Sequence, residues 1–256
     1  MGQAWAIRQK DARLVFADGT IFEGYGLGAQ GHVCAEICFN TALTGYQEIL
    51  TDLSYAGQII TFTFPHIGNV GTNDEDIETV SLAGGTGVRG CILRADITNP
   101  SNYRSAQHLD QWLKSRNIIG ISGIDTRALT AFIREKGYVN GLIAYNEAGQ
   151  FDDTKLKNEA AAWAGLEGMD LAKDVTCAQT YNWKQTRWAW PEGYNTQETP
   201  KFKVVAIDYG AKSNILRCLA SVGCDVTVVP ASSSAASASN AGMTRSRMHG
   251  AQFPGR

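Results

Sequence analysis

The chain has 256 residues, of which 44% are hydrophobic and 9% aromatic, so it holds enough apolar side chains for one or two packed domains. Its formal net charge of -2 gives no basic surface that would neutralise phosphates, and we expect no nucleic-acid partner. No apolar run approaches the roughly 18 residues that span a bilayer, and residues 1–10 lack the apolar centre of a signal peptide. We therefore expect no membrane partner and a cytoplasmic location.

The cysteines indicate thiols and not a metal site or a disulfide framework. They lie in apolar surroundings, without CxxC pairs and without a histidine at ligand spacing, and the four histidines are scattered along the chain. We expect reduced thiols and no bound metal. The six are Cys34, Cys38, Cys91, Cys177, Cys218 and Cys224.

Three extended segments are predicted near the start of the chain. Residues 13–28 contain two alternating apolar runs on either side of Asp18-Gly19, which is a hairpin pattern. Residues 33–39 and 58–64 are rich in β-branched and aromatic side chains, which favours strands.

A polar stretch separates the last two of these strands. Ten hydrogen-bonding side chains occur within the sixteen residues 40–55, on segments too apolar for a flexible linker. One interpretation is a surface for a polar ligand or a partner. The other is a turn-rich part of the core whose polar groups bind its own backbone. The ten are Asn40, Thr41, Thr44, Tyr46, Gln47, Glu48, Thr51, Asp52, Ser54 and Tyr55.

Strand and helix patterns follow in the middle of the chain. Residues 84–97 return to strand character, and Ser101 or Ser105 is predicted to cap a helix that runs through Arg116. Residues 125–136 give the clearest helix, with Asp125 as its N-cap and Gly137 just beyond its end. A short helix is expected over residues 154–163.

The last third changes character twice. Residues 174–202 lack sustained periodicity and contain Pro191 and Pro200, which is typical of a linker between domains. Residues 203–230 then show a buried strand, a helix and a second strand, which predict a βαβ unit. The first of these strands ends at Asp208-Tyr209-Gly210, where parallel sheets place ligands. Residues 231–256 begin with an Ala/Ser-rich run and are expected to be an aberrant or disordered tail.

Several long motifs carry a family resemblance that runs in register from about Leu14 to Pro230. The chain closely resembles the small (glutamine amidotransferase) subunit of glutamine-dependent carbamoyl-phosphate synthetase, in a truncated form. Because the resemblance stops near Pro230, we expect a frame change in the coding sequence there. The motifs are NTALTGYQEILTDLSYAGQIITFTFPHIGNVGTN at 40–73, SNYRS at 101–105, GISGIDTRALT at 120–130 and VVAIDYGAKSNILRCLASVGCDVTVVP at 204–230.

The resemblance implies an α/β fold in two parts. A mixed β/α small-subunit domain would be followed by the first βαβ unit of a class I glutamine amidotransferase (flavodoxin-like) domain, cut short. The implied boundaries are 1–151 for the N-terminal domain, 152–200 for a linker region, 201–230 for the start of the amidotransferase domain and 231–256 for the tail.

The resemblance also implies an activity and its partners. In that family the small subunit hydrolyses L-glutamine and passes ammonia to a large subunit, which makes carbamoyl phosphate from bicarbonate and ATP for arginine and pyrimidine biosynthesis. The expected partners are the large subunit and glutamine. We expect no cofactor in this chain, since ATP and Mg belong to the large subunit of the family.

Catalytic residues are not expected in this chain. Hydrolysis of a carboxamide needs a nucleophilic thiolate, a histidine and an orienting carboxylate, and the family's GxCxGxQ-like motif is absent. Cys218 and Cys224 lie where the resemblance assigns no catalysis, so we expect the chain alone to be inactive. The substrate-binding residue is Ser54 in TDLSY, which matches the serine of the family's TDPSY, although Leu53 replaces the proline and Ala42 replaces the serine of the NTS motif.

Three functional hypotheses remain open at this point. The first is a subunit of a glutamine-hydrolysing ligase. The second is a truncated, non-catalytic docking module that binds only the large subunit. The third is an unrelated cytosolic α/β binding protein.

Overall fold

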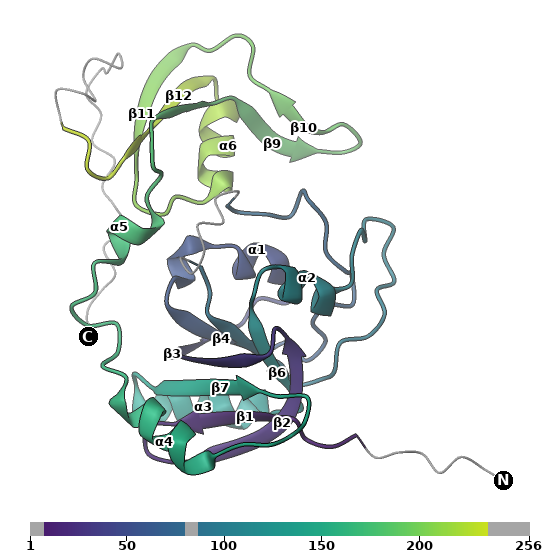
Figure 1. The fold of residues 1–256 in the computed structure, drawn as a ribbon. Helices are drawn as coiled ribbons and strands as arrows, with labels where there is room; N and C mark the ends of the chain where they lie inside the picture. The colour runs from purple at the N-terminus through teal and green to yellow at the C-terminus, as the bar shows by residue number, and fades with distance from the viewer. Residues whose placement is uncertain (1–7, 80–86, 235–256) are drawn as a thin grey trace. The chain divides into compact units, whose positions relative to one another are not determined.

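The computed structural model describes residues 8–79 and 87–234 (Figure 1). The chain forms two compact units, Met1–Val175 and Thr176–Arg256, each of which is considered by itself. The tail predicted for residues 231–256 lies, from residue 235 onward, outside the described residues. Both units mix helices with strands, which confirms the expected α/β class.

The first unit is built on a closed barrel of seven strands in the order β1-β2-β6-β5-β4-β3-β7. Closure leaves these strands without an unpaired edge. The strands are β1 (Ala12–Phe16), β2 (Ile21–Gly28), β3 (Gly31–Asn40), β4 (Gln58–Phe62), β5 (Gly90–Ile92), β6 (Ile119–Ser122) and β7 (Asn140–Tyr145).

The predicted hairpin is confirmed as β1 and β2, which pair antiparallel from Ala12 opposite Gly24. Gly19 supplies the positive φ of 85° that the turn requires, and the Asp18 carboxylate accepts a hydrogen bond from the Thr20 amide at 3.0 Å. β1 also pairs with β7, Ala12 lying opposite Tyr145, and this second pairing closes the barrel.

The remaining strand pairs of the barrel are of both kinds, since β2 pairs with β6 and β3 with β7 in antiparallel orientation. β3 pairs with β4, β4 with β5 and β5 with β6, all in parallel. Parallel neighbours need crossovers; α1 (Tyr46–Leu50) lies between β3 and β4, and α2 (Leu109–Ser115) lies between β5 and β6. Of the strand predicted over residues 84–97, residues 84–86 lie outside the described residues, and the described part forms only the three-residue strand β5.

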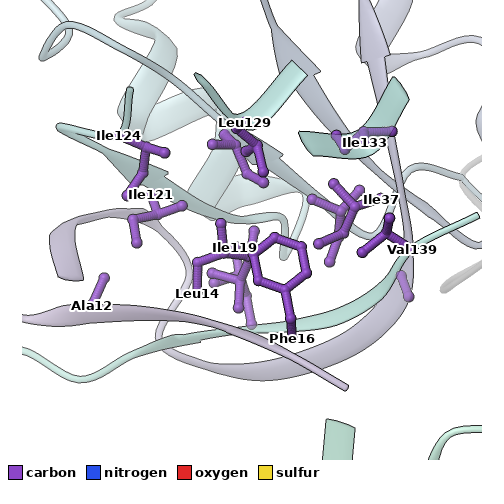
Figure 2. Packing of buried hydrophobic residues seen from close by; sticks show 14 of the residues in the cluster. Ala12, Leu14, Phe16, Ile37, Ile119, Ile121, Ile124, Leu129, Ile133 and Val139 are labelled. Carbon is purple, nitrogen blue, oxygen red and sulfur yellow. The ribbon is translucent and has the colours of Figure 1, made fainter. Parts of the chain in front are cut away.

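The barrel interior holds the main core, whose side chains point toward one another in Figure 2. Phe16 lies near its centre, with the Phe132 ring 5.1 Å away in an edge-on arrangement. Leu129 and Ile133 of α3 (Thr126–Lys136) join the same cluster, so this helix packs on the barrel through its buried face. On β4 the period of two places Ile59 in this interior cluster and Ile60 in a second cluster with α1 and α2.

The ends of α3 are as the sequence predicts. The Asp125 carboxylate accepts hydrogen bonds from the amides of Arg127 and Ala128, both at 3.1 Å, and Gly137 follows the helix with a φ of 81°. Asp125 as N-cap and Gly137 as terminator are therefore confirmed.

The predicted N-cap of the preceding helix is wrong. α2 begins at Leu109, and its N-cap is His108, whose Nδ1 accepts a hydrogen bond from the Asp110 amide at 3.2 Å. Neither Ser101 nor Ser105 caps it. The amide of Gln107 is bonded to the Thr72 carbonyl at 3.1 Å in an isolated β-bridge, so the chain stays extended up to His108.

Residues 152–200 do not form the expected linker. They begin with α4 (Asp153–Ala162), which is capped by Asp152 through the Lys155 amide at 3.0 Å. Leu156 and Ala160 of this helix are buried in the third core cluster with side chains of β1 and β7. α5 (Leu171–Val175) follows, and the division between units falls after it and not near residue 151.

The second unit contains the predicted βαβ unit. β11 (Phe202–Asp208) and β12 (Cys224–Pro230) pair in parallel with Val204 opposite Val226, and α6 (Ser213–Ser221) connects them. This prediction is confirmed. β8 (Tyr181–Trp183) adds an antiparallel strand to the free side of β12.

The rest of the expected linker covers α6. β9 (Gln185–Ala189) and β10 (Gly193–Thr196) form a hairpin. Arg217 of α6 is only 8% exposed; its Nε donates to the Gln185 side chain at 2.9 Å, and its guanidinium lies 4.1 Å from the centre of the Tyr194 ring. These contacts order a segment that has no helical or strand periodicity of its own.

Candidate functional site

Ser54 lies in a single 3-10 turn, Leu53–Tyr55, that connects α1 to β4. The turn begins at Asp52, which is only 4% exposed and whose carboxylate accepts a hydrogen bond from the Ser54 amide at 2.9 Å. The Ser54 residue itself is exposed, and its hydroxyl makes no hydrogen bond within the described part of the chain. The backbone of Ser54 is thus fixed while its hydroxyl is exposed.

Asp52 is the residue that sequence reasoning missed. It was grouped with the other polar side chains of residues 40–55, but its role is specific, because an aspartate two residues before the serine caps the turn that carries it. The Asp-x-Ser spacing is the signal for such a cap.

A side-chain pair braces the two strands on either side of this turn. The side-chain Nδ2 of Asn40, at the end of β3, donates to the Tyr55 hydroxyl at 2.9 Å, and the side-chain Oδ1 of Asn40 accepts from the Ala42 backbone amide at 2.8 Å. Asn40 therefore joins the end of β3 to the turn that carries Ser54.

The polar side chains of α1 are occupied by the loop that follows β4. Gln47 exchanges two hydrogen bonds with the Asn73 backbone, donating at 2.5 Å and accepting at 3.0 Å. The Thr51 hydroxyl accepts from the Glu78 amide at 2.9 Å, and the Tyr46 hydroxyl donates to the Gly71 carbonyl. The interpretation that these polar groups serve the protein's own backbone is confirmed for Tyr46, Gln47 and Thr51.

Glu48 differs from its neighbours on α1. Burial raises the pKa of its carboxyl group above the ordinary value, and the nearby charges of Asp76 and Glu78 raise it further, against the opposing effect of Arg104. Arg104 is itself bonded to Asp76 at 2.7 Å and to Glu75 at 3.0 Å. Half-buried Glu48 thus lies near the ion pairs that Arg104 makes with Asp76 and Glu75.

The cysteines range from buried to exposed thiols. All six are free thiols. Burial raises the pKa of Cys91 and of Cys38 to about 12, which keeps both protonated and unreactive near neutral pH. Cys218 is exposed on α6 and Cys224 is buried at the start of β12.

The Asp208 side chain holds the segment Asp208-Tyr209-Gly210 at the end of β11 by accepting hydrogen bonds from backbone amides. The Asp208 carboxylate, 7% exposed, accepts from the amides of Gly210 at 2.9 Å, Ala211 at 2.8 Å and Cys177 at 2.7 Å. These three bonds leave Asp208 fixing the loop. Tyr209 is 63% exposed and is the part of the segment that faces solvent.

The described residues contain neither a cluster of metal-ligating side chains nor a helix that could cross a membrane. Among residues 8–79 and 87–234, no group of three or more His, Cys, Asp or Glu side chains is placed to hold a metal ion. In the same ranges no helix combines the length and the apolar character that crossing a bilayer requires.

The chain is similar to known proteins over most of its length. Residues 14–143, which include the barrel except for the first two residues of β1 and the last two of β7, match the family model "Carbamoyl-phosphate synthase small chain, CPSase domain". Proteins named carbamoyl phosphate synthase small chain from Bradyrhizobium diazoefficiens and Mesorhizobium japonicum are each 63% identical, over 232 and 231 residues. The protein of that name from Rhizobium meliloti is 62% identical over 234 residues.

These matches cover this chain almost entirely but the relatives only in part. They span 91%, 90% and 91% of this chain and 59%, 58% and 58% of the three relatives. Among solved structures, a peptidase M28 precursor from Shewanella amazonensis matches at 15% identity with a TM-score of 0.30, covering 54% of this chain and 34% of that one, which is too low to bear on the fold. The family model and the three relatives agree, and the chain belongs to the carbamoyl-phosphate synthase small chain family.

Proposed function

We propose that this chain serves in a glutamine-dependent carbamoyl-phosphate synthase, where its first unit docks on a large subunit and Ser54 contacts L-glutamine. The observation that carries the proposal is 63% identity over 232 residues to a carbamoyl phosphate synthase small chain. The exposed hydroxyl of Ser54 on a turn fixed by buried Asp52 supports the glutamine contact.

The chemistry at Ser54 is recognition and not catalysis. A hydroxyl both donates and accepts hydrogen bonds, so it suits the ammonium or the carboxylate of an amino acid. Because the Ser54 amide is bonded to Asp52, the position of the hydroxyl depends on one χ1 angle and not on a flexible loop.

Glutamine hydrolysis needs groups that the 256 residues do not supply in a recognisable motif. The nucleophilic thiolate, the histidine that moves its proton and the carboxylate that orients the histidine act as one unit. We propose that the βαβ unit at 201–230 corresponds to the start of a class I glutamine amidotransferase (flavodoxin-like) sheet. In the assembled enzyme, ammonia from glutamine would feed a large subunit that uses ATP, Mg and bicarbonate in the cytoplasm.

Docking is tested by co-purification of the full chain with the large subunit from Bradyrhizobium diazoefficiens. Coelution on size-exclusion chromatography is the expected result. Ser54→Ala is the matched control, since a residue that contacts glutamine need not affect docking. A chain that is folded by circular dichroism but elutes separately from the large subunit would contradict the docking role.

Glutamine chemistry is tested on the same full chain. Incubation with glutamine should release ammonia only at the background rate. Turnover that either Cys218→Ala or Cys224→Ala abolishes would contradict the assignment of no catalytic residue.

A non-catalytic docking module is the second candidate function. The closed barrel favours it, because the barrel has its own core and all its strands are paired. The two candidates separate in a calorimetric titration of the full chain with glutamine. Heat that is lost in Ser54→Ala supports the glutamine contact, whereas coelution with the large subunit and no heat supports the docking module.

A further inference from the structure

A pocket of about 310 Å³ lies on the first unit, against the solvent-facing side of α3. Four of its lining residues come from that helix and have the i, i+3, i+4, i+7 spacing of one helical face: Arg127, Thr130, Ala131 and Arg134. The fifth, Thr63, directly follows β4. The pocket thus spans two segments of the barrel unit, and two arginines lie at its ends.

The two arginines lack the partners that other arginines of this unit have. Arg8, Arg13, Arg94 and Arg104 each lie within 4.0 Å of a carboxylate. Arg127 and Arg134 have no ion pair, hydrogen bond from the side chain or ring contact in the described part of the chain. Both are exposed, so their charges are available to a ligand.

The helix itself offers these arginines no acid. On a helix surface a side chain meets those three or four residues away. For Arg127 the neighbours on the helix are Thr130 and Ala131, and for Arg134 they are the same two residues together with Gly137 and Tyr138. The two arginines therefore lie at the two ends of one helical face whose middle residues, Thr130 and Ala131, are small and neutral.

Helix stability does not account for Arg127. It lies in the first turn of α3, where the positive end of the helix dipole disfavours a cation; the carboxylate at this end is the N-cap Asp125, which is bonded to the Arg127 and Ala128 amides and to Arg94. Arg134, in the last turn, is at the favourable end. The helix dipole therefore favours a cation at Arg134 and not at Arg127.

The side chain of Thr63 adds a donor. Its amide is bonded to the Asn40 carbonyl at 3.1 Å, while its hydroxyl makes no hydrogen bond within the described residues. Thr61, two residues earlier on the same face of β4, is fully buried and its hydroxyl is also without a partner there. The Thr130 hydroxyl, by contrast, already donates to the Thr126 carbonyl at 2.7 Å, so Thr130 contributes shape and not a donor.

We propose that this pocket binds a small anion with two acidic groups, one on each arginine. Arg127 and Arg134 are seven residues apart, about 10 Å along the helix axis, and their long side chains can reach toward the small residues between them. A guanidinium presents a planar fork of donors that matches both phosphate and carboxylate oxygens. This site involves neither Ser54 nor the βαβ unit and is independent of the proposed glutamine contact.

Isothermal titration calorimetry on the full chain tests the proposal, with inorganic pyrophosphate, succinate and inorganic phosphate as separate probes. Pyrophosphate or succinate should bind, and whichever binds shows whether the acid groups are phosphates or carboxylates. Orthophosphate should bind at least about tenfold more weakly, because its single phosphorus centre reaches one arginine. Arg127→Gln and Arg134→Gln should each weaken binding about tenfold or more.

Lys157→Gln is the matched control, since it removes one exposed positive charge from α4 outside the pocket. It should leave the affinity within about twofold. Arg134→Lys keeps the charge but loses the fork, and it should still weaken binding. Circular dichroism and urea unfolding confirm that each variant is folded.

Three outcomes would overturn the proposal. The first is the absence of heat with both pyrophosphate and succinate at concentrations of about 10 mM. The second is an equal loss of affinity in Lys157→Gln, which would indicate a general field of charge and not a site. The third is binding of an acidic peptide without binding of either small anion, which would make the pocket part of a protein interface.

Discussion

Asp52 accepts a hydrogen bond from the backbone amide of Ser54 at 2.9 Å, and the two residues differ sharply in exposure. Asp52 is 4% exposed, whereas Ser54 is exposed and its hydroxyl is unbonded within the described residues. One residue therefore holds the turn and the other presents a group to solvent, and substitutions should separate these roles.

Asp52→Ala should lower the free energy of unfolding by about 1–2 kcal/mol, because the turn loses its cap. Ser54→Ala should change it by less than about 0.5 kcal/mol, as expected for an exposed side chain. Urea unfolding followed by circular dichroism measures both. Equal losses in the two variants would show that the Ser54 hydroxyl has a structural role.

Gly26 on β2 should tolerate no side chain. A Cβ atom added there would lie 1.9 Å from Cδ2 of Tyr145, so the ring or the strand would have to move. Gly26→Ala should therefore destabilise the protein by about 1–3 kcal/mol, the range for overpacking.

Gly87→Ala is the control for that substitution. Within the described residues, and apart from its chain neighbours, no atom lies within 4 Å of a Cβ added at Gly87, and its φ is not positive, so the change should cost less than about 0.5 kcal/mol. The difference between the two variants is measured by thermal and urea unfolding. Equal stability of Gly26→Ala and Gly87→Ala would contradict the close packing of Gly26 against the Tyr145 ring.

Glu48 gives a pH dependence with a definite sign. Its pKa is raised in the folded state, so over the pH range just above the ordinary value of 4.5 the folded protein holds a proton that the unfolded chain has released. Stability from this group is present at low pH and is lost as the pH rises through the folded-state pKa.

Glu48→Gln removes this dependence. The free energy of unfolding of Glu48→Gln relative to the wild type should therefore be higher at pH 7 than at pH 4. Urea unfolding of both proteins at the two pH values gives the difference directly. A difference that is smaller at pH 7 than at pH 4 would mean that the charged form of Glu48 is favoured in the fold.

Thiol reactivity should follow burial. Cys218 is exposed, while Cys91 is 1% exposed and burial raises its pKa to about 12. Iodoacetamide at pH 8 should modify Cys218 first and leave Cys91 unmodified, as measured by mass spectrometry of tryptic peptides. In protein unfolded by urea, Cys218 and Cys91 should react at similar rates. If Cys91 stayed unmodified in urea, its protection would not come from burial in the fold.

Local signals predicted much of the fold. The turn at Asp18-Gly19, the cap at Asp125 and the glycine at Gly137 are each decided within a few residues, and all three were correct. The βαβ unit is also local, because a strand, a helix and a strand in succession pair in parallel.

Non-local pairings explain what the sequence could not predict. Barrel closure depends on β1 meeting β7, and no residue in either strand indicates its partner. The true start of α2 depends on the bridge from Gln107 to Thr72, which keeps the chain extended past the two serines. β8 is a strand because Asn182 lies opposite Thr227, 45 residues away, and their side chains are bonded at 3.1 Å.

At the candidate site, too, local signals in the sequence indicate some features, whereas contacts between distant residues decide the others. Ser54 is proposed as a glutamine contact through a family motif, and that role stays a prediction. The network that uses up Tyr46, Gln47 and Thr51 was visible only as a density of polar residues, since its partners in the loop after β4 lie more than twenty residues away.

The pairing of Ala12 with Tyr145 also constrains the order of events during synthesis. β1 leaves the ribosome among the first segments. Its partner β7 is made much later, because Tyr145 follows Ala12 by 133 residues. At about 5–20 residues per second, β1 waits several seconds with only β2 beside it. The edge of β1 that later closes the barrel is then open to other strands, so nascent chains halted before Tyr145 are the ones most exposed to wrong pairing.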